Sequence, residues 1–406
     1  MTGARFGTDG IRGPADTVVT PAVAAAVGAA VVAVLGNDVW VARDTRPSGP
    51  ALAQAVCDGV CAAGGRATLL GVLPTPGLSL RVRDEHASAG IMVTASHNPP
   101  EDNGLKVVGP DGGKLPAAVL AALTTAIVAP APPRAGGEVR EAQGADRYVA
   151  ALLAALPAGR WLSGRRVLFD GAAGAAADVG VAVLRALGAE VVRHDGPAIN
   201  VACGAVHPEY AAAAVLAGRC DVGVVLDGDG DRIALVDHAG RVLDGDALLW
   251  LGRRGPVMVG TVMTNLGLQV ALAGEGIPLV RTPVGDAHVA EAIAAHGAPL
   301  GGEPSGHVMY ADGPPTADGL YAGLRTLAAA PTLDTTGYQP AYQAHQNLRG
   351  VGLPPLDLAF VEAAGGRAVV RKSGTEALVR VMVEHADRPT AEALRDRVVA
   401  LIREQA

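Results

Sequence analysis

The stretch VLDGDGDRI, residues 225–233, joins the end of an apolar strand to a loop in which Asp227, Asp229 and Asp231 alternate with two glycines. Carboxylates this close repel one another unless a cation lies between them, and glycine lets the backbone wrap tightly. Three carboxylate oxygens with room for further oxygen ligands suit Mg²⁺. A calcium-binding EF-hand loop needs Gly at its sixth position, where this chain has Arg232. We therefore predict one magnesium site here rather than a calcium sensor or a solvated acidic turn.

Two other segments repeat the order of elements around this loop. In each, a strand that ends in a Pro or Gly turn leads to a helix, a second strand, a polar loop and a third strand. Because α/β folds usually bind ligands at the carboxyl ends of strands, each polar loop is expected to face a ligand. The three loops are TASHNPPEDNG at residues 94–104, DGDGD at residues 227–231 and GGEPSGH at residues 301–307.

The composition agrees with a multi-domain α/β protein. The chain has 406 residues, more than one typical core of roughly 100 to 200 residues holds. Only 3% of the residues are aromatic, so the cores must be built from Ala, Val and Leu. Pro-rich or polar segments at residues 129–137 and 330–340 indicate breaks between domains. We expect three similar α/β domains and a smaller C-terminal α+β domain with one strand pair, at residues 1–147, 148–246, 247–334 and 335–406.

Charge and hydropathy exclude several classes of protein. The longest apolar run, residues 22–35, is shorter than the roughly 18 residues that span a bilayer, so we expect no membrane segment. Arg5, Asp9 and Arg12 interrupt any apolar core of a secretory signal, which predicts a cytoplasmic protein. The net charge of −7 argues against nucleic acid as a partner, and four cysteines without CxxC spacing are expected to be reduced thiols.

Ser96 lies in the first polar loop, within the segment TASHNP. No GxSxG elbow surrounds it, so a hydrolase of that type is not expected. A free hydroxyl is a weak nucleophile, but a phosphorylated serine held against a metal ion can donate its phosphoryl group.

Two further segments carry groups that suit phosphate and sugar. RKSGTE, residues 371–376, gathers a cation, hydroxyls and a glycine in one turn, where backbone N–H groups and arginine can grip a phosphate. Neither the Walker spacing nor GxGxxG occurs, so nucleotide binding is not expected. In the loop GGEPSGH, carboxylate and hydroxyl groups can hold sugar hydroxyls, and the imidazole can bind phosphate or move protons. The candidate residues are Arg371, Ser373, Gly374, Thr375 and Arg380 in the first segment and beyond it, and Glu303, Ser305 and His307 in the second.

Six segments in this order resemble the α-D-phosphohexomutase family over nearly the whole chain. They are RFGTDGIRG at residues 5–13, ARDTRPSG at 42–49, TASHNP, DGDGDR, GGEPSGH and RKSGTE. The resemblance implies four domains around a central cleft, three of them α/β repeats. It also implies a mutase that moves a phosphoryl group by way of a phosphoserine and a sugar bisphosphate, which also acts as activator.

The resemblance implies a role for each candidate residue. Ser96 would be the phosphoserine, and its phosphate would bind Mg²⁺ together with the three Asp residues. The clamp at residues 371–380 would hold the distal phosphate, while Glu303 and Ser305 orient the sugar and Arg232 and His307 contribute to substrate binding. Candidates for proton transfer are Lys106, Arg12, His97 and His307. We prefer Lys106, because the chain has only three lysines and a buried lysine can exchange a proton.

The opening FGTDGIRG is similar to the branch of the family that acts on glucosamine phosphates. It predicts interconversion of glucosamine 6-phosphate and glucosamine 1-phosphate. Pro304 stands where that branch usually has Gln and the mannose/glucose branch has Met, so mannose and glucose phosphates stay open as substrates. A sugar-phosphate-binding protein without catalysis is a further alternative, and the sequence does not decide between a monomer and a homodimer.

Overall fold

The computed structural model describes residues 6–405 except 8–9, 130–131, 133 and 373–377. The chain divides into two compact units. Unit 1 contains Met1–Leu248 and Ser305–Leu333, and unit 2 contains Leu249–Pro304 and Asp334–Ala406. The expected fold class is confirmed: three α/β parts precede a smaller C-terminal part. The expected domain borders stay a prediction.

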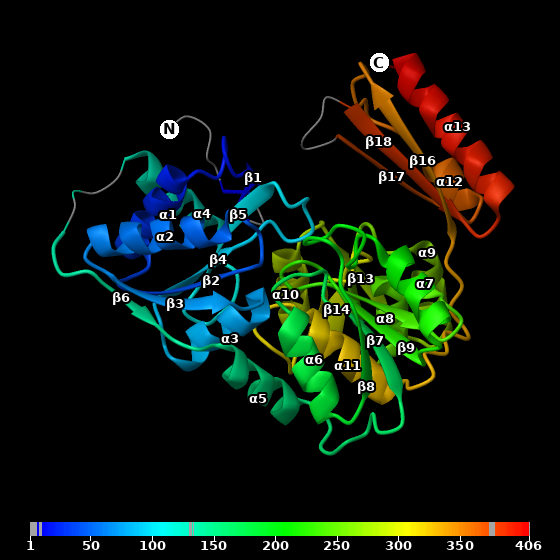
Figure 1. Ribbon diagram of the computed structural model, residues 1–406. Helices are drawn as coiled ribbons and strands as arrows, with labels where there is room; N and C mark the ends of the chain where they lie inside the picture. The colour runs from blue at the N-terminus through cyan, green and yellow to red at the C-terminus, as the bar shows by residue number, and fades with distance from the viewer. Residues whose placement is uncertain (1–5, 8–9, 130–131, 133, 373–377, 406) are drawn as a thin grey trace. The chain divides into compact units, whose positions relative to one another are not determined.

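The first sheet of unit 1 has six strands in the order β1-β5-β4-β2-β3-β6. β2, β3, β4 and β6 run parallel, whereas β5 is antiparallel to β4 and β1 is antiparallel to β5. Helices α1, α2 and α4 lie on one face and α3 lies on the other (Figure 1). The strands are β1 (Ile11–Pro14), β2 (Asp38–Arg43), β3 (Arg66–Val72), β4 (Ala89–Val93), β5 (Asp102–Val108) and β6 (Glu138–Glu141), and the helices are α1 (Pro21–Val34), α2 (Gly49–Ala62), α3 (Thr75–Asp84) and α4 (Ala117–Val128).

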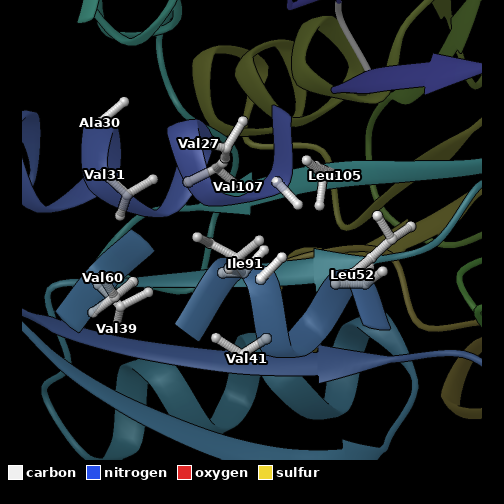
Figure 2. Packing of buried hydrophobic residues seen from close by; sticks show 14 of the residues in the cluster. Val27, Ala30, Val31, Val39, Val41, Leu52, Val60, Ile91, Leu105 and Val107 are labelled. Atoms are coloured by element: carbon white, nitrogen blue, oxygen red, sulfur yellow. The ribbon is translucent and has the colours of Figure 1, made fainter. Parts of the chain in front are cut away.

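The core above this sheet is built from small and β-branched side chains, as the composition predicts. Figure 2 shows Val39, Val41 and Ile91 on the strands beneath Val27 and Val31 of α1. β-Branched residues suit the pleated surface, while the alanines of the helices allow a close approach. The packing of this core keeps the sheet rigid, and strand β4 of the sheet leads directly into the Ser96 loop.

Helices α1 and α2 touch through glycines. A Cβ atom on Gly59 of α2 would lie 1.9 Å from the carbonyl oxygen of Ala25, and one on Gly28 of α1 would lie 2.3 Å from that of Val56. These distances are far below van der Waals contact with backbone atoms that cannot move aside. The helix crossing therefore requires glycine at both positions.

We expect Gly59→Ala to lower the free energy of unfolding by roughly 1–3 kcal/mol, because the added methyl group overpacks the crossing. Gly274→Ala is the matched control, since Gly274 ends helix α9 (Leu266–Gly274) with open space around it. Alanine has less backbone freedom than glycine in the unfolded chain, so this substitution should raise the free energy of unfolding by up to about 1 kcal/mol. Denaturant unfolding of both variants measures this, and a Gly59→Ala protein as stable as the parent would contradict the account.

The second sheet of unit 1 has the order β11-β10-β9-β7-β8. Helix α7 covers one face, where Ala211 and Val215 pack against the sheet. Helices α6 and α11 cover the other face, where Gly180 lies against Phe169 and Gly323 against Ile233. The strands of this sheet are β7 (Arg166–Asp170), β8 (Glu190–His194), β9 (Val222–Leu226), β10 (Ile233–Asp237) and β11 (Val242–Leu243). The other elements are α5 (Ala145–Ala155), α6 (Ala177–Ala186), α7 (Pro208–Gly218), α8 (Gly245–Leu251), α11 (Gly319–Ala329) and β15 (Val308–Tyr310), which is not a strand of this sheet.

Unit 2 contains a small parallel sheet and an antiparallel one. β12 pairs in parallel with β13 and β14. In the C-terminal part, β18 pairs with both β16 and β17, and α13 packs on this sheet (Figure 1). The elements besides α9 are β12 (Met258–Thr261), β13 (Leu279–Thr282), α10 (Asp286–His296), β14 (Leu300–Gly302), β16 (Tyr342–Arg349), α12 (Ala359–Ala363), β17 (Arg367–Lys372), β18 (Leu378–His385) and α13 (Arg388–Gln405).

The expectation of a single C-terminal strand pair was wrong, because β16 adds a third strand. Its sequence, YQAHQNLR, buries only Ala344 and Leu348, and the polar residues between them hide the strand pattern. Along the part of the chain that the structure describes, no helix combines the length and the apolar character needed to cross a bilayer.

Candidate active site

Two polar loops of unit 1 meet at the carboxyl ends of β4 and β9. Ser96 is 1% exposed, and its Oγ donates a hydrogen bond of 2.6 Å to Asp227 Oδ2. Its backbone has φ +53°, an uncommon conformation for a residue with a side chain. The predicted phosphoserine and the predicted metal loop, 131 residues apart in sequence, are therefore in direct contact.

The two glycines of the DGDGD loop are required for different reasons. A Cβ atom on Gly228 would lie 2.5 Å from the carbonyl oxygen of Ser96, so only glycine allows the Ser96 loop to approach. Gly230 has φ +76°, which glycine adopts without strain. The backbone then folds over so that Asp227 Oδ1 accepts hydrogen bonds from the amides of Gly230 (3.1 Å) and Arg232 (3.2 Å).

The three Asp carboxylates form a buried acidic cluster, with oxygens that all lie within 4.8 Å of one another. Lys106 supplies a compensating charge: its Nζ donates to Asp229 Oδ2 at 2.6 Å and to Asp231 Oδ2 at 2.8 Å. Burial and the two neighbouring carboxylates raise the pKa of Asp227 to about 8. At Asp227, burial and these two carboxylates therefore outweigh the opposing charge of Arg232.

The cluster fits a divalent cation. Asp229 Oδ1 and Asp231 Oδ1 are buried and accept no hydrogen bond from the described residues. Leaving acceptors like these dry and unpartnered is costly, and carboxylate oxygens are the ligands that Mg²⁺ prefers. Asp227, Asp229 and Asp231 could hold such an ion, with Ser96 Oγ beside them.

The groups proposed for proton transfer have distinct protonation states. Burial lowers the pKa of His97 to about 4, with Arg232 and Arg12 adding to the effect, so this imidazole is neutral near pH 7. Its Nδ1 lies 3.3 Å from Ser96 Oγ. For Lys106, burial lowers the pKa, but Asp229 and Asp231 outweigh burial and the net pKa is raised. Lys106 is therefore an ammonium group.

His307 also joins this group of residues in unit 1. Its Nδ1 lies 3.8 Å from Asp231 Oδ1. Burial raises the pKa of Asp231, but the charges of Lys106, His307 and Arg232 outweigh it and hold that pKa well below its usual value. Ser305, two residues before His307, is exposed.

Arg12 lies on β1 of unit 1. The other predicted site residues lie in unit 2 or outside the described residues. Arg371 on β17 and Arg380 on β18 are directly paired across the two strands, so the structure brings these two guanidinium groups to one region of the sheet. Glu303 Oε1 accepts a hydrogen bond of 3.0 Å from the amide of Gly285. Ser373, Gly374 and Thr375 lie outside the described residues.

Sequence reasoning missed several polar residues behind the reactive loops. Arg46 is completely buried, bonded to Asp44 at 3.0 Å and to the carbonyl oxygens of the Ser96 loop. Thr75, the first residue of α3, donates from its hydroxyl to Asp229 Oδ2. Asn200 reaches the Ser96 loop from another part of the chain. The one available signal was the segment ARDTRPSG, which contains Asp44 and Arg46 and is one of the six segments that resemble the family.

Comparisons with known proteins agree with this geometry. Four regions match the phosphoglucomutase/phosphomannomutase family: α/β/α domain I at residues 3–131, domain II at 146–240, domain III at 245–345 and the C-terminal domain at 334–401. The chain belongs to this phosphohexomutase family of isomerases, as its motifs predict. The phosphoglucosamine mutase of Cereibacter sphaeroides is 40% identical over 100% of both chains, and that of Jannaschia sp. is 40% identical over 99% of both.

Solved structures show the same fold. A phosphoglucomutase/phosphomannomutase family protein from Burkholderia thailandensis has a TM-score of 0.83 and 25% identity, over 100% of this chain and 99% of that one. The N-acetylphosphoglucosamine mutase of Aspergillus fumigatus, solved in complex with GlcNAc-6P and magnesium, has a TM-score of 0.64 and 19% identity, over 98% and 95% of the two chains.

Asp229→Asn should weaken Mg²⁺ binding by roughly tenfold or more, because the charge and number of carboxylate ligands set the affinity for the ion. The exposed Asp58→Asn on α2 is the control and should bind as the parent does. Titration calorimetry with MgCl₂ measures the affinity. Mg²⁺ at 100 times its Kd should also raise the stability of the parent by about 2.7 kcal/mol. Equal Mg²⁺ affinity in all three proteins would contradict the assignment.

Proposed function

We propose that the chain is a phosphoglucosamine mutase. It would interconvert glucosamine 6-phosphate and glucosamine 1-phosphate through a phosphorylated Ser96 and a bisphosphorylated sugar, a step that supplies amino-sugar nucleotide synthesis. The observation that carries the proposal is the hydrogen bond between the buried hydroxyl of Ser96 and Asp227. The 40% identity to phosphoglucosamine mutases over the full chain supports the choice of sugar.

Phosphoryl transfer in this site would proceed in two balanced halves. The bond between phosphorus and Ser96 Oγ breaks as a bond to a sugar hydroxyl forms, and the hydroxyl loses its proton. The bisphosphate then turns over, and its other phosphoryl group returns to Ser96. A bound Mg²⁺ would neutralise charge on the phosphoryl group, and Asp227, Asp229 and Asp231 are the residues that would hold it, together with the phosphate of Ser96.

The chain's own residues would hold the charges and move the proton. Lys106 stays our preferred proton carrier, because its Nζ lies within the acidic cluster. In its ammonium form it can donate a proton, and it must lose one before it can act as a base. His97 and His307 are the imidazole alternatives, and Arg12 is the remaining candidate.

Residues of unit 2 would bind the rest of the substrate. Arg371 and Arg380 are directly paired across β17 and β18, and two guanidinium groups in one region of a sheet suit the binding of a phosphate, which supports a role in holding the distal phosphate. Ser373, Gly374 and Thr375 would complete that clamp. Glu303 and Ser305 would orient the sugar, with Arg232 and His307 as further contacts. The cytoplasmic location expected from the sequence stays a prediction.

Ser96→Ala should abolish turnover, with a loss of at least about 10⁴-fold, because the proposed reaction passes the phosphoryl group through the Ser96 hydroxyl in both halves. Exposed Ser163→Ala on the same unit is the control and should keep the parent's activity. A coupled mutase assay of both variants measures this, with unfolding curves to check the fold. Turnover retained by Ser96→Ala would remove the phosphoserine mechanism.

The parent enzyme should prefer glucosamine 6-phosphate over mannose 1-phosphate and glucose 1-phosphate in kcat/KM. The comparison uses Mg²⁺-loaded protein with a trace of the matching bisphosphate. A preference for either neutral hexose would instead support a phosphomannomutase or phosphoglucomutase, the alternative that Pro304 leaves open. Binding of sugar phosphate without turnover on any of the three would indicate a protein that has lost catalysis.

A further inference from the structure

The backbone around Ser96 is held by two side chains that grip the same pair of carbonyl groups. The carbonyl oxygen of Ser96 accepts hydrogen bonds from Asn200 Nδ2 (2.8 Å) and Arg46 Nη2 (3.0 Å). The carbonyl oxygen of Asn98 accepts from the same two groups, at 3.0 Å from Asn200 and 2.8 Å from Arg46. The turn that presents the Ser96 hydroxyl is thus clamped on its carbonyl side.

The two clamping side chains come from different sheets of unit 1. Arg46 follows β2 of the first sheet and is completely buried against Asp44. Asn200 follows β8 of the second sheet, is 4% exposed, and has a left-handed backbone with φ +59°. A Cβ atom on Gly228 would lie 3.0 Å from Asn200 Nδ2, so Asn200 also adjoins the DGDGD loop.

The clamp stabilises an unfavourable backbone conformation in the Ser96 turn. Ser96 has positive φ, and a residue with a side chain keeps that conformation only where its surroundings enforce it. From the other side, the Ser96 amide donates to Thr94 Oγ1 at 2.9 Å, and Thr94 donates to Asp44 at 2.6 Å. Of the groups that hold this turn, Asn200 comes from the sheet that carries the acidic cluster.

We propose that Asn200 is a positioning residue for phosphoryl transfer. Its two N–H groups fix the Ser96 and Asn98 carbonyls, and thereby hold Ser96 Oγ against Asp227 at the acidic cluster. This inference rests on the proposed phosphoserine mechanism. Misplacement of a reacting atom by about 1 Å can cost on the order of 100-fold in rate, so a group that touches neither sugar nor phosphate can still control kcat.

Asn200→Gly tests the proposal without introducing strain, because glycine adopts positive φ freely. The matched control is Ala202→Gly in the same loop, where Ala202 also has positive φ (+53°) but sends no side chain to the Ser96 turn. We expect kcat to fall roughly 10- to 100-fold in Asn200→Gly, with KM changed less than about threefold. Ala202→Gly should have the parent's kcat.

Two more measurements separate positioning from general support. Amide hydrogen exchange should speed up in the peptide that contains residues 94–104 in Asn200→Gly, and not in Ala202→Gly. Asn200→Asp keeps the shape but turns the donor into an acceptor that faces two carbonyl groups. The kcat of Asn200→Asp should fall at least as far as that of Asn200→Gly. Because Asp and Asn are isosteric, Asn200→Asp is the variant that tests the proposal if Asn200→Gly does not fold.

Several outcomes would overturn the inference. They are a kcat of Asn200→Gly equal to that of Ala202→Gly, unchanged exchange in the 94–104 peptide, or full activity of Asn200→Asp. Ser96→Ala, assayed in the same series, keeps the two proposals apart. If Ser96→Ala retains turnover, the phosphoserine mechanism fails; if it is inactive while Asn200→Gly is normal, only the role of Asn200 fails.

Discussion

The repulsion among Asp227, Asp229 and Asp231 is the constraint on which the rest of unit 1 depends. Burying ionised carboxylates costs several kcal/mol each, and a single ammonium group, that of Lys106, lies between two of them. Burial, together with the charges of Asp231 and Asp229, raises the pKa of Asp227. A buried loop with this charge destabilises the fold unless a cation lies among the carboxylates, and the cluster therefore fits a bound divalent ion.

The two sheets of unit 1 are arranged around this cluster. Each delivers one strand, one polar turn and one antiparallel return strand, β4 to β5 in the first sheet and β9 to β10 in the second. Lys106 sits on the return strand β5 and Arg232 directly precedes β10. Rigid neighbouring strands therefore set the distance between hydroxyl, ammonium and carboxylates. Gly228 lets the two turns touch, and Gly230 supplies the positive φ that folds the DGDGD loop.

Much of this could be predicted from the sequence, because apolar runs bounded by turn residues have clear ends. Strand β4 coincides with such a run, AGIMV at residues 89–93, and the resemblance to the family implies the contact between Ser96 and the acidic cluster. β16 could not be predicted, since polar residues separate its buried positions. Asn200 and Arg46 were missed for another reason: a polar loop residue looks solvated until its partner, 104 or 50 residues away, is known.

The central claim is that Ser96 carries the phosphoryl group, and phosphopeptide mapping tests it most directly. The parent protein is incubated with glucosamine 1,6-bisphosphate and Mg²⁺, digested, and sequenced by tandem mass spectrometry, before and after a chase with excess glucosamine 6-phosphate. The account predicts one phosphoryl group per chain, on the peptide that contains Ser96, in exchange with the added sugar phosphate. A protein that turns over with its phosphoryl group on another residue, or with none, would contradict it.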